Sequence, residues 1–325
     1  MDNEEILKEF RGVIRKDYEG CLDNNLSEEK DIEVYVEALY QGYLDACRTF
    51  KWLPESKVKK CKKDDKKREI IKGILQGEET EGVAYRIKNY LEKGSPDGYS
   101  EFDDIHRELC ENLICDFSSK NKNADISYGQ AQKIINMAFK YLYCCKCDDE
   151  MKERFDACHM PLDSFSLEWF KRHFKEYDFT KEKVASKLEE KLFKGDKNKS
   201  LLLKMDSIGS WSSMESIGNM KKNEVYQGEK YPYEFYRDMI KAYCKDYNIN
   251  SPLELDFIVW PKMQKIMAAE AFIKAFEEDD DNWVKNAIKN ETYDIKNLDE
   301  ILKKRLHKIR PLICDRTDSQ VCKKK

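Results

Sequence analysis

Proline and glycine are scarce in this sequence, and long apolar runs are missing. Among 325 residues there are 7 Pro and 13 Gly, a composition typical of long helices joined by short polar loops. The longest apolar stretches are far below the roughly 20 residues that a membrane-spanning helix needs. The first residues, MDNEEILKEF, are acidic where a secretory signal is basic. The sequence therefore predicts a soluble protein of the cytoplasm without a membrane partner.

An excess of basic charge is also missing. The formal net charge is −4, so the chain lacks the overall positive field that many nucleic-acid-binding proteins have. Basic side chains do gather in residues 57–68, KVKKCKKDDKKR, a pattern typical of a solvated loop or helix end that leaves a local binding patch open. The 12 Cys have no regular spacing, which favours reduced thiols over a disulfide framework.

Strict alternation of apolar and polar residues, the pattern of half-buried strands, is absent over any useful length. Apolar residues recur instead at helical spacing. The predicted fold is all-α, a multi-helix orthogonal bundle with a helix-hairpin-helix-like element, built as one domain or as two helical subdomains. Helices are expected outside the central segment over residues 4–18, 31–50, 69–76, 82–92, 101–117, 182–193, 233–247, 252–276, 282–289 and 298–309.

Three regions are expected along the chain. They are an N-terminal helical region, a central helical domain with the hairpin-like motif, and a C-terminal helical extension, over residues 1–98, 99–262 and 263–325. The central region is the most informative. Its segment 126–147, ISYGQAQKIINMAFKYLYCCKC, predicts a long helix introduced by Gly129.

The polar residues of this helix suggest a binding face. Its apolar residues form one stripe, and Lys133, Asn136 and Lys140 fall on a different face, which we expect to meet a ligand. The turn at Gly129 is expected to expose backbone N–H groups at the helix N-terminus, where a phosphate binds well.

A family resemblance rests on this helix and on a motif further along the chain. Residues 129–136, GQAQKIIN, resemble the G-x-G-x-K-x-x-N segment of the helix-hairpin-helix (HhH-GPD) DNA glycosylase superfamily. In that superfamily an apolar-Pro-Val-Asp turn then opens the next helix, and residues 159–163, HMPLD, are similar. The resemblance covers residues 127–172. It departs from the family pattern at Ala131, which replaces a glycine, and in a longer, irregular connector that carries cysteines.

The resemblance implies a DNA glycosylase that recognises and excises a damaged or modified base, with or without a Schiff-base lyase step. Lys133 is then the amine that attacks the sugar, and Asp163 is the carboxylate that stabilises charge and assists proton transfer. The residues implied to contact DNA are Gly129, Gln130, Gln132, Asn136 and Lys140. The side chains implied to hold the extruded base are Tyr128 and Trp169.

The same resemblance sets the expected partners. The partner is duplex DNA with a modified or damaged base, in genome maintenance or in defence against phage DNA. No cofactor and no metal are expected, because the C-terminal four-cysteine pattern of an iron–sulfur centre is absent.

Simpler interpretations exist for both central residues. A lysine in a helix usually faces solvent, and Asp163 precedes an apolar-periodic helix, where an aspartate caps the N-terminus. The two interpretations of Asp163 are compatible, because a capping carboxylate also keeps its chemistry.

Two further site hypotheses use the connector. Arg154 and His159 have the R-x4-H spacing of HEPN-type ribonucleases, although Pro161 ends any helix that holds both. A zinc site would use soft ligands whose spacing departs from the usual C-x-x-C pairs, namely Cys144, Cys145, Cys147, Cys158 and His159.

The strongest rival hypothesis is a non-enzymatic helical interaction or regulatory protein. In this interpretation Trp211 and Trp260 pack in the core. Ser251 caps a helix whose first residue is Pro252, a pattern that indicates fold and not function.

Overall fold

The computed structural model is all-α within the residues that it describes. These are residues 7, 10, 20–27, 32–47, 64–77, 81–94, 102–120, 126–174, 209–216 and 231–277. No strand occurs among them, and residues 25 and 146 form an isolated parallel bridge. The predicted fold class is therefore confirmed for this part of the chain. The chain divides into two compact units, residues 1–261 and 262–325, and each is considered by itself.

Several sequence predictions fall outside the described residues. They are most of the helix at 4–18, the helices at 182–193, 282–289 and 298–309, and basic residues 57–63. Among the described residues, we find no helix with the length and apolar character needed to span a bilayer.

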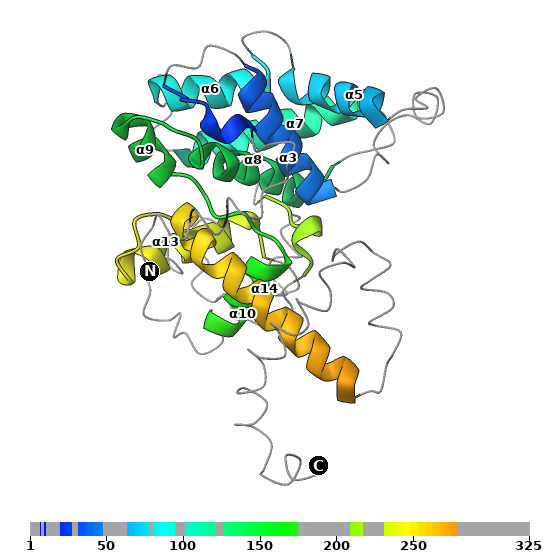
Figure 1. Cartoon of the computed structure of the whole chain (residues 1–325), viewed down its shortest axis with the longest axis vertical. Coiled ribbons are helices and arrows are strands. Elements are labelled where there is room, and N and C mark those ends of the chain that lie inside the picture. Colours follow the sequence, from blue (N-terminus) through cyan, green and yellow to red (C-terminus); the bar gives the residue numbers. More distant parts are fainter. Residues whose placement is uncertain are drawn as a thin grey trace, which may run out of the picture. The chain divides into compact units, whose positions relative to one another are not determined.

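A central helix, α8 (Tyr128–Tyr143), organises the first unit. It packs against α3 (Glu33–Cys47) and α7 (Phe102–Lys120), and α3 in turn contacts α5 (Asp64–Gln76) and α6 (Val83–Lys93). Figure 1 shows these five helices grouped together. The approach of α3 to α8 is close at Gly42, where a Cβ would overlap the carbonyl oxygen of Ile134. A glycine at this position lets the two backbones meet.

The connector after α8 is more regular than the sequence predicted. It holds a short helix, α9 (Asp149–Asp156), whose first turn is capped by the Asp148 side chain accepting from the Met151 N–H at 2.8 Å. The apolar side chains of Met151 and Phe155 are buried. The expectation of an irregular connector is therefore wrong, because an N-cap and two buried apolar residues stabilise a helical turn.

Three more helices complete the described part of the chain. They are α10 (Ser164–Phe174), α13 (Tyr233–Asp246) and α14 (Pro252–Glu277), with the 3-10 turns η1 (Gly20–Asp23) and η4 (Trp211–Ser213). The predicted cap of α14 is present, since Ser251 Oγ accepts from the Glu254 N–H at 3.1 Å.

Residues on every face of α8 are buried. Its apolar residues Ile134, Ile135 and Leu142 are fully buried, and so are the polar residues Gln132 and Asn136. The prediction that the second face of this helix is open to a ligand is therefore wrong. Helices α10, α13 and α14 carry the partners of that face, as the hydrogen bonds below show.

Candidate functional site

Lys133 and Asp163 lie in contact, although 30 residues separate them in the sequence. The Lys133 Nζ is 3.3 Å from Asp163 Oδ2, and each side chain is 8% exposed. Lys133 comes from the second turn of α8, and Asp163 precedes α10. The distance is short enough for the roles that the resemblance implies for this amine and this carboxylate, and those roles remain a prediction.

The two carboxylate oxygens of Asp163 have different partners. Its Oδ1 accepts from the N–H groups of Phe165 (2.8 Å) and Ser166 (3.1 Å), which are free donors at the start of α10. In return, the Asp163 N–H donates to Ser166 Oγ at 2.7 Å. The predicted N-cap is confirmed, and it leaves Oδ2 for Lys133. A carboxylate fixed in this way points at the amine with little rotational freedom.

The third member of the site is Trp211, whose ring centroid lies 4.7 Å from Lys133 Nζ. This is the geometry of a cation–π contact. Trp211 belongs to η4, which the chain reaches 78 residues after Lys133. The non-enzymatic interpretation of the sequence assigned Trp211 to core packing, and no local spacing links it to Lys133. Its ring is part-exposed, so it separates the ion pair from solvent on this side.

Gly129 anchors η4 in place instead of opening a phosphate site. The Gly129 N–H donates to Met214 O at 2.9 Å, and the Ser127 hydroxyl donates to Ser212 O. A Cβ on Gly129 would overlap the carbonyl oxygen of Trp211. The expectation of free N–H groups at this turn is wrong, because the chain's own carbonyl oxygens already occupy these donors.

The other residues predicted to contact DNA have internal partners. Gln130 closes a capping box with Ser127, in which its Oε1 accepts from the Ser127 N–H at 3.0 Å. Gln132, Asn136 and Lys140 are fully buried. Their predicted contact with a duplex is not available in this conformation, because no solvent-facing atom remains to make it.

A second Lys–Asp pair lies two turns further along α8. The Lys140 Nζ is 2.6 Å from Asp256 Oδ2, and the side chains are 1% and 2% exposed. Burial raises the pKa of Asp256 above its ordinary value, and the Lys140 ammonium opposes that shift. Three rings surround this ammonium, those of Phe10, Phe257 and Trp260, at 4.1, 4.9 and 5.2 Å from their centroids. Both side chains of this pair are therefore shielded from solvent.

A chain of buried hydrogen bonds continues from the site toward α7. The Asn136 amide donates to Gln132 Oε1 (3.1 Å) and to the Tyr233 hydroxyl oxygen (3.0 Å). The Tyr233 hydroxyl also lies 3.0 Å from His159 Nδ1, and His159 Nε2 lies 2.8 Å from Asp103 Oδ1. With an Nε2–H that donates to Asp103, His159 Nδ1 accepts from Tyr233.

Burial lowers the pKa of His159 to about 3, even though the carboxylate of Asp103 favours protonation. Burial alone would raise the pKa of Asp103, but the His159 hydrogen bond and the charges of Arg237 and Lys241 hold it well below its ordinary value. At neutral pH the network therefore contains a neutral imidazole that donates to an ionised carboxylate.

The two side chains predicted to hold an extruded base lie elsewhere. The ring of Tyr128 is buried 5.7 Å from that of Tyr233. The ring of Trp169 stacks on His173 at 5.0 Å and meets Tyr243 edge-on. Neither forms a described contact with the Lys133 amine, so the aromatic residue at the site is Trp211.

The alternative site hypotheses are not assembled in the described residues. Arg154 donates to Leu91 O and pairs with Glu150, whereas the His159 ring bonds Asp103 and Tyr233. No group of three or more His, Cys, Asp or Glu arranged to hold a metal occurs among the described residues. Several of the connector thiols contact helix carbonyl oxygens, those of Cys144, Cys145 and Cys158.

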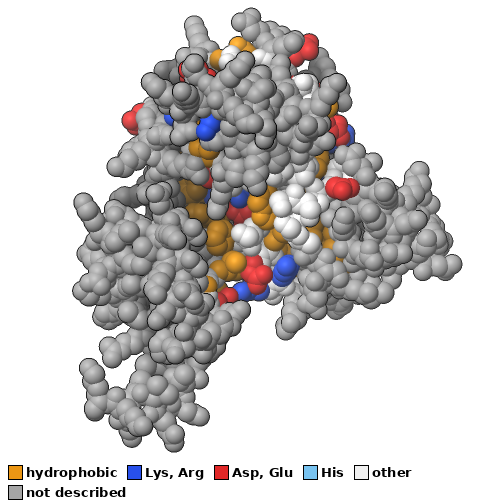
Figure 2. All heavy atoms as spheres, turned by 90° about the vertical axis from the view of Figure 1, so that its right-hand side faces the viewer, with side chains coloured by type: hydrophobic (Ala, Val, Ile, Leu, Met, Phe, Trp, Pro, Cys, Tyr) orange, Lys and Arg blue, Asp and Glu red, His pale blue; other side chains and the backbone are white. Residues whose placement is uncertain are grey.

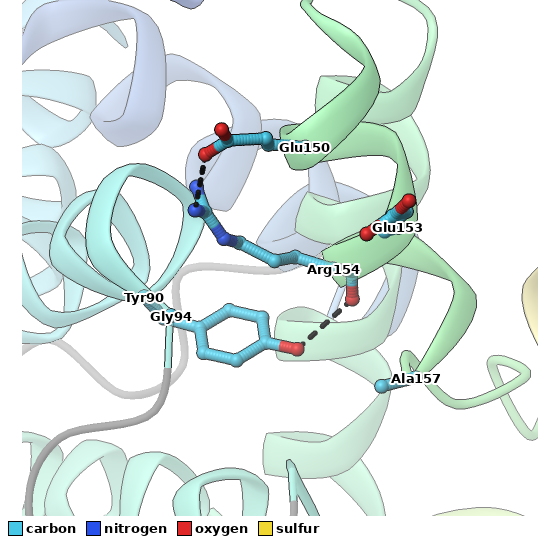
Figure 3. Close-up of a pocket in the computed structure, with 6 residues that line it drawn as sticks. All are labelled: Tyr90, Gly94, Glu150, Glu153, Arg154 and Ala157. Carbon is cyan, nitrogen blue, oxygen red and sulfur yellow. Dashed lines mark hydrogen bonds and ion pairs between the residues drawn. The ribbon is translucent and has the colours of Figure 1, made fainter.

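A pocket of about 500 Å³ lies at the C-terminal end of α6, beside α9. Figure 3 shows Tyr90 donating to the Arg154 carbonyl oxygen and Arg154 paired with Glu150 at its wall. The third charged residue of the wall is Glu153, another carboxylate. On the surface shown in Figure 2, the described basic side chains stand beside acidic ones.

Comparison of the chain with protein-family models, with curated proteins and with solved structures gives no match in any of the three.

Proposed function

We propose that this chain is a DNA N-glycosylase-like enzyme of the cytoplasm that removes a damaged or modified base through Lys133 and Asp163. The observation that carries the proposal is the 3.3 Å contact between the Lys133 amine and the Asp163 carboxylate. The resemblance of residues 127–172 to the HhH-GPD superfamily supports the same two roles.

The chemistry follows from the two groups. Asp163 first takes a proton from the Lys133 ammonium, which frees the amine to attack the sugar carbon C1′. The bond from C1′ to the base breaks as the new bond forms, and the base leaves with the bonding electrons and takes up the proton that the attacking nitrogen loses. Asp163 then gives its proton to the ring oxygen as the sugar opens, and the resulting carboxylate stabilises the protonated imine between Lys133 and C1′, which borohydride reduces to a stable amine.

Access to Lys133 requires a movement of η4. The Trp211 ring lies 4.7 Å from the amine, and a sugar carbon must approach it much more closely to react. DNA binding is therefore coupled to displacement of residues 210–214, whose carbonyl oxygens accept from the Gly129 N–H and the Ser127 hydroxyl. Phosphate oxygens would replace those carbonyl oxygens at the same two donors.

The test is incubation of the protein with duplexes that carry an abasic site or one of several modified bases, followed by borohydride. We expect a covalent adduct with wild type and none with Lys133→Met. The matched control is Lys152→Met, which removes an exposed lysine of α9. Equal adduct formation by all three proteins would contradict the nucleophile assignment. Binding to DNA is read in parallel as a mobility shift that weakens as salt rises.

A non-enzymatic helical protein is the second candidate. It is favoured by the occupied donors at the α8 N-terminus, since the Gly129 N–H is already bonded to Met214 O. In that case Lys133 and Asp163 join α8 to α10 and do no chemistry. The absence of both a DNA shift and an adduct for wild type would support this candidate.

A further inference from the structure

The side chain of Gln132, next to Lys133, is tied to the residue next to Asp163. It is fully buried, and its Nε2 donates to Leu162 O at 2.9 Å while its Oε1 accepts from the Leu162 N–H at 3.3 Å. The Gln132 amide therefore forms hydrogen bonds with both the N–H and the carbonyl oxygen of Leu162. The residues of the ion pair, Lys133 and Asp163, directly follow Gln132 and Leu162 in the chain.

The Gln132 amide has one possible orientation. Its Nε2 also donates to Gly129 O at 2.8 Å, and its Oε1 also accepts from Asn136 Nδ2 at 3.1 Å. Both donors and both acceptor positions are thus used. A reversed amide would place its oxygen against two carbonyl oxygens and its NH2 against two other donors. An amide with every bond satisfied is held rigidly.

The hydrogen bonds between Gln132 and the Leu162 backbone set the position of Asp163. Gln132 and Lys133 are consecutive on α8, and Leu162 and Asp163 are consecutive before α10. Because Gln132 is bonded to Leu162, the next residue of each segment, Lys133 or Asp163, is held opposite the other. The α10 N–H groups hold Asp163 Oδ1 from the other side. The carboxylate is therefore fixed by two separate sets of bonds.

Further buried hydrogen bonds hold the Gln132 amide in place. Asn136 donates to it and to Tyr233, whose hydroxyl donates to the neutral His159. This chain of contacts joins α8, α13 and the connector before α10. The support ends at Asp103, which also pairs with Arg237 and Lys241.

We infer that Gln132 is a positioning residue, whose amide holds the Leu162 backbone so that the Asp163 carboxylate stays against the Lys133 amine. Its effect on catalysis rests on the proposed function, whereas its effect on the geometry of the pair does not. Nothing in the glycosylase resemblance assigns this role, since the resemblance placed Gln132 on DNA.

The test is a double-mutant cycle between Gln132→Met and Asp163→Asn. Methionine keeps the volume and deletes all four hydrogen bonds. We expect single-turnover base excision to fall roughly 10- to 100-fold in Gln132→Met, with the Kd for DNA changed less than about 3-fold. In the Asp163→Asn background, Gln132→Met should cause little further loss. The matched control is Gln41→Met, which removes a fully buried amide of α3.

A milder variant covers the case in which Gln132→Met does not fold. Tyr233→Phe keeps the ring and deletes the hydroxyl that accepts from Asn136. We expect excision to slow a few fold, and again only when Asp163 is present. An undiminished excision rate in a folded Gln132→Met, or a loss that is as large in the Asp163→Asn background, would overturn the inference.

A readout that needs no activity separates this inference from the proposed function. The urea midpoints of the same four proteins are measured, and we expect the double variant to lose less than the sum of the single losses. If wild type neither excises a base nor forms an adduct, the proposed function fails. The urea cycle then decides alone: non-additive losses support the positioning role, and additive losses overturn it.

Discussion

Helix α8 carries two buried lysines two turns apart, and each pairs with an aspartate from another element. The Lys140 pair is 2.6 Å long and 1% to 2% exposed, and three aromatic rings surround its ammonium. The Lys133 pair is 3.3 Å long and 8% exposed, and one ring of a short turn covers it. The first pair is enclosed by several rings, whereas the second contacts one described ring and is slightly more exposed.

The aspartates of the two pairs also differ in what stabilises their negative charge. Asp163 keeps two backbone N–H donors for Oδ1 when Oδ2 loses its lysine. Asp256 is buried inside the first unit, and burial raises its pKa, so its charge depends on the Lys140 ammonium. Of these two aspartates, Asp163 is therefore the one that keeps hydrogen-bond donors when the charge of its lysine changes, which the proposed reaction requires.

The largest effect is expected at Lys140. Lys140→Met leaves Asp256 as an uncompensated buried charge and should lower the free energy of unfolding by about 3 to 5 kcal/mol. Urea denaturation measures this loss. The double variant Lys140→Met with Asp256→Leu should recover most of it, because no charge remains buried. A single variant as stable as wild type would show that this pair is not a structural bridge.

A smaller loss is expected at Lys133. Lys133→Met should cost about 2 kcal/mol, since the Asp163 carboxylate retains its two capping hydrogen bonds. The same denaturation experiment compares the two lysines directly. If Lys133→Met is as destabilising as Lys140→Met, Lys133 is equally structural and the two pairs do not differ in role.

The cover over Lys133 is tested through Gly129. Gly129→Ala overlaps the Trp211 carbonyl and should cost about 1 to 2 kcal/mol. It should also speed the acylation of Lys133 and leave Lys140 unreactive, as read by mass spectrometry of digested protein. The control is Gly73→Ala in α5, where a Cβ meets no atom within 4 Å, and helix propensity should add about 0.5 to 1 kcal/mol. Unchanged Lys133 reactivity in Gly129→Ala would show that η4 does not limit access.

Acid is expected to act on the Lys133 side of α8. The pKa of His159 is about 3 in the folded protein and about 6.5 when unfolded. The unfolded chain therefore binds a proton that the folded chain refuses, so stability is full above pH 6.5 and declines as the pH falls toward 3. Between pH 6.5 and 5.5 the loss is about 1 kcal/mol.

Hydrogen exchange locates this acid effect. Amides near Leu162, which Gln132 ties to the network of His159, should lose protection before those near Asp256. In His159→Gln the decline of stability over this pH range should be reduced, although buried His106, whose pKa burial also lowers, contributes to what remains. Equal loss of protection at both places would contradict the distinction between the two pairs.

Local pattern was enough to predict most of the described helices. Helical periodicity located α3, α6, α7, α13 and α14 to within a few residues, and an aspartate before an apolar-periodic run indicated the α10 cap. The pairing of Lys133 with Asp163 was expected from the family resemblance alone, because the two residues lie in motifs that follow one another in that superfamily.

Tertiary packing decided the rest. The helical pattern predicted that Lys133, Asn136 and Lys140 lie on a face open to a ligand, because polar residues usually face water, and the resemblance placed Gln132 on DNA. All four are buried because residues 30 to 116 positions further along the chain supply their partners. Trp211 and its contact with Gly129 depend on a meeting of distant segments that no local spacing signals.

The most direct measurement is the position of the borohydride adduct in the wild-type chain. Protein trapped on abasic duplex DNA is digested with trypsin and the modified peptide is sequenced by mass spectrometry. We predict that the sugar remnant lies on Lys133, because its amine faces a carboxylate that hydrogen bonds hold in place. An adduct on Lys140 or on the lysines of residues 57–68 instead, or no adduct at all, would contradict the claim that the Lys133–Asp163 pair is a reaction centre.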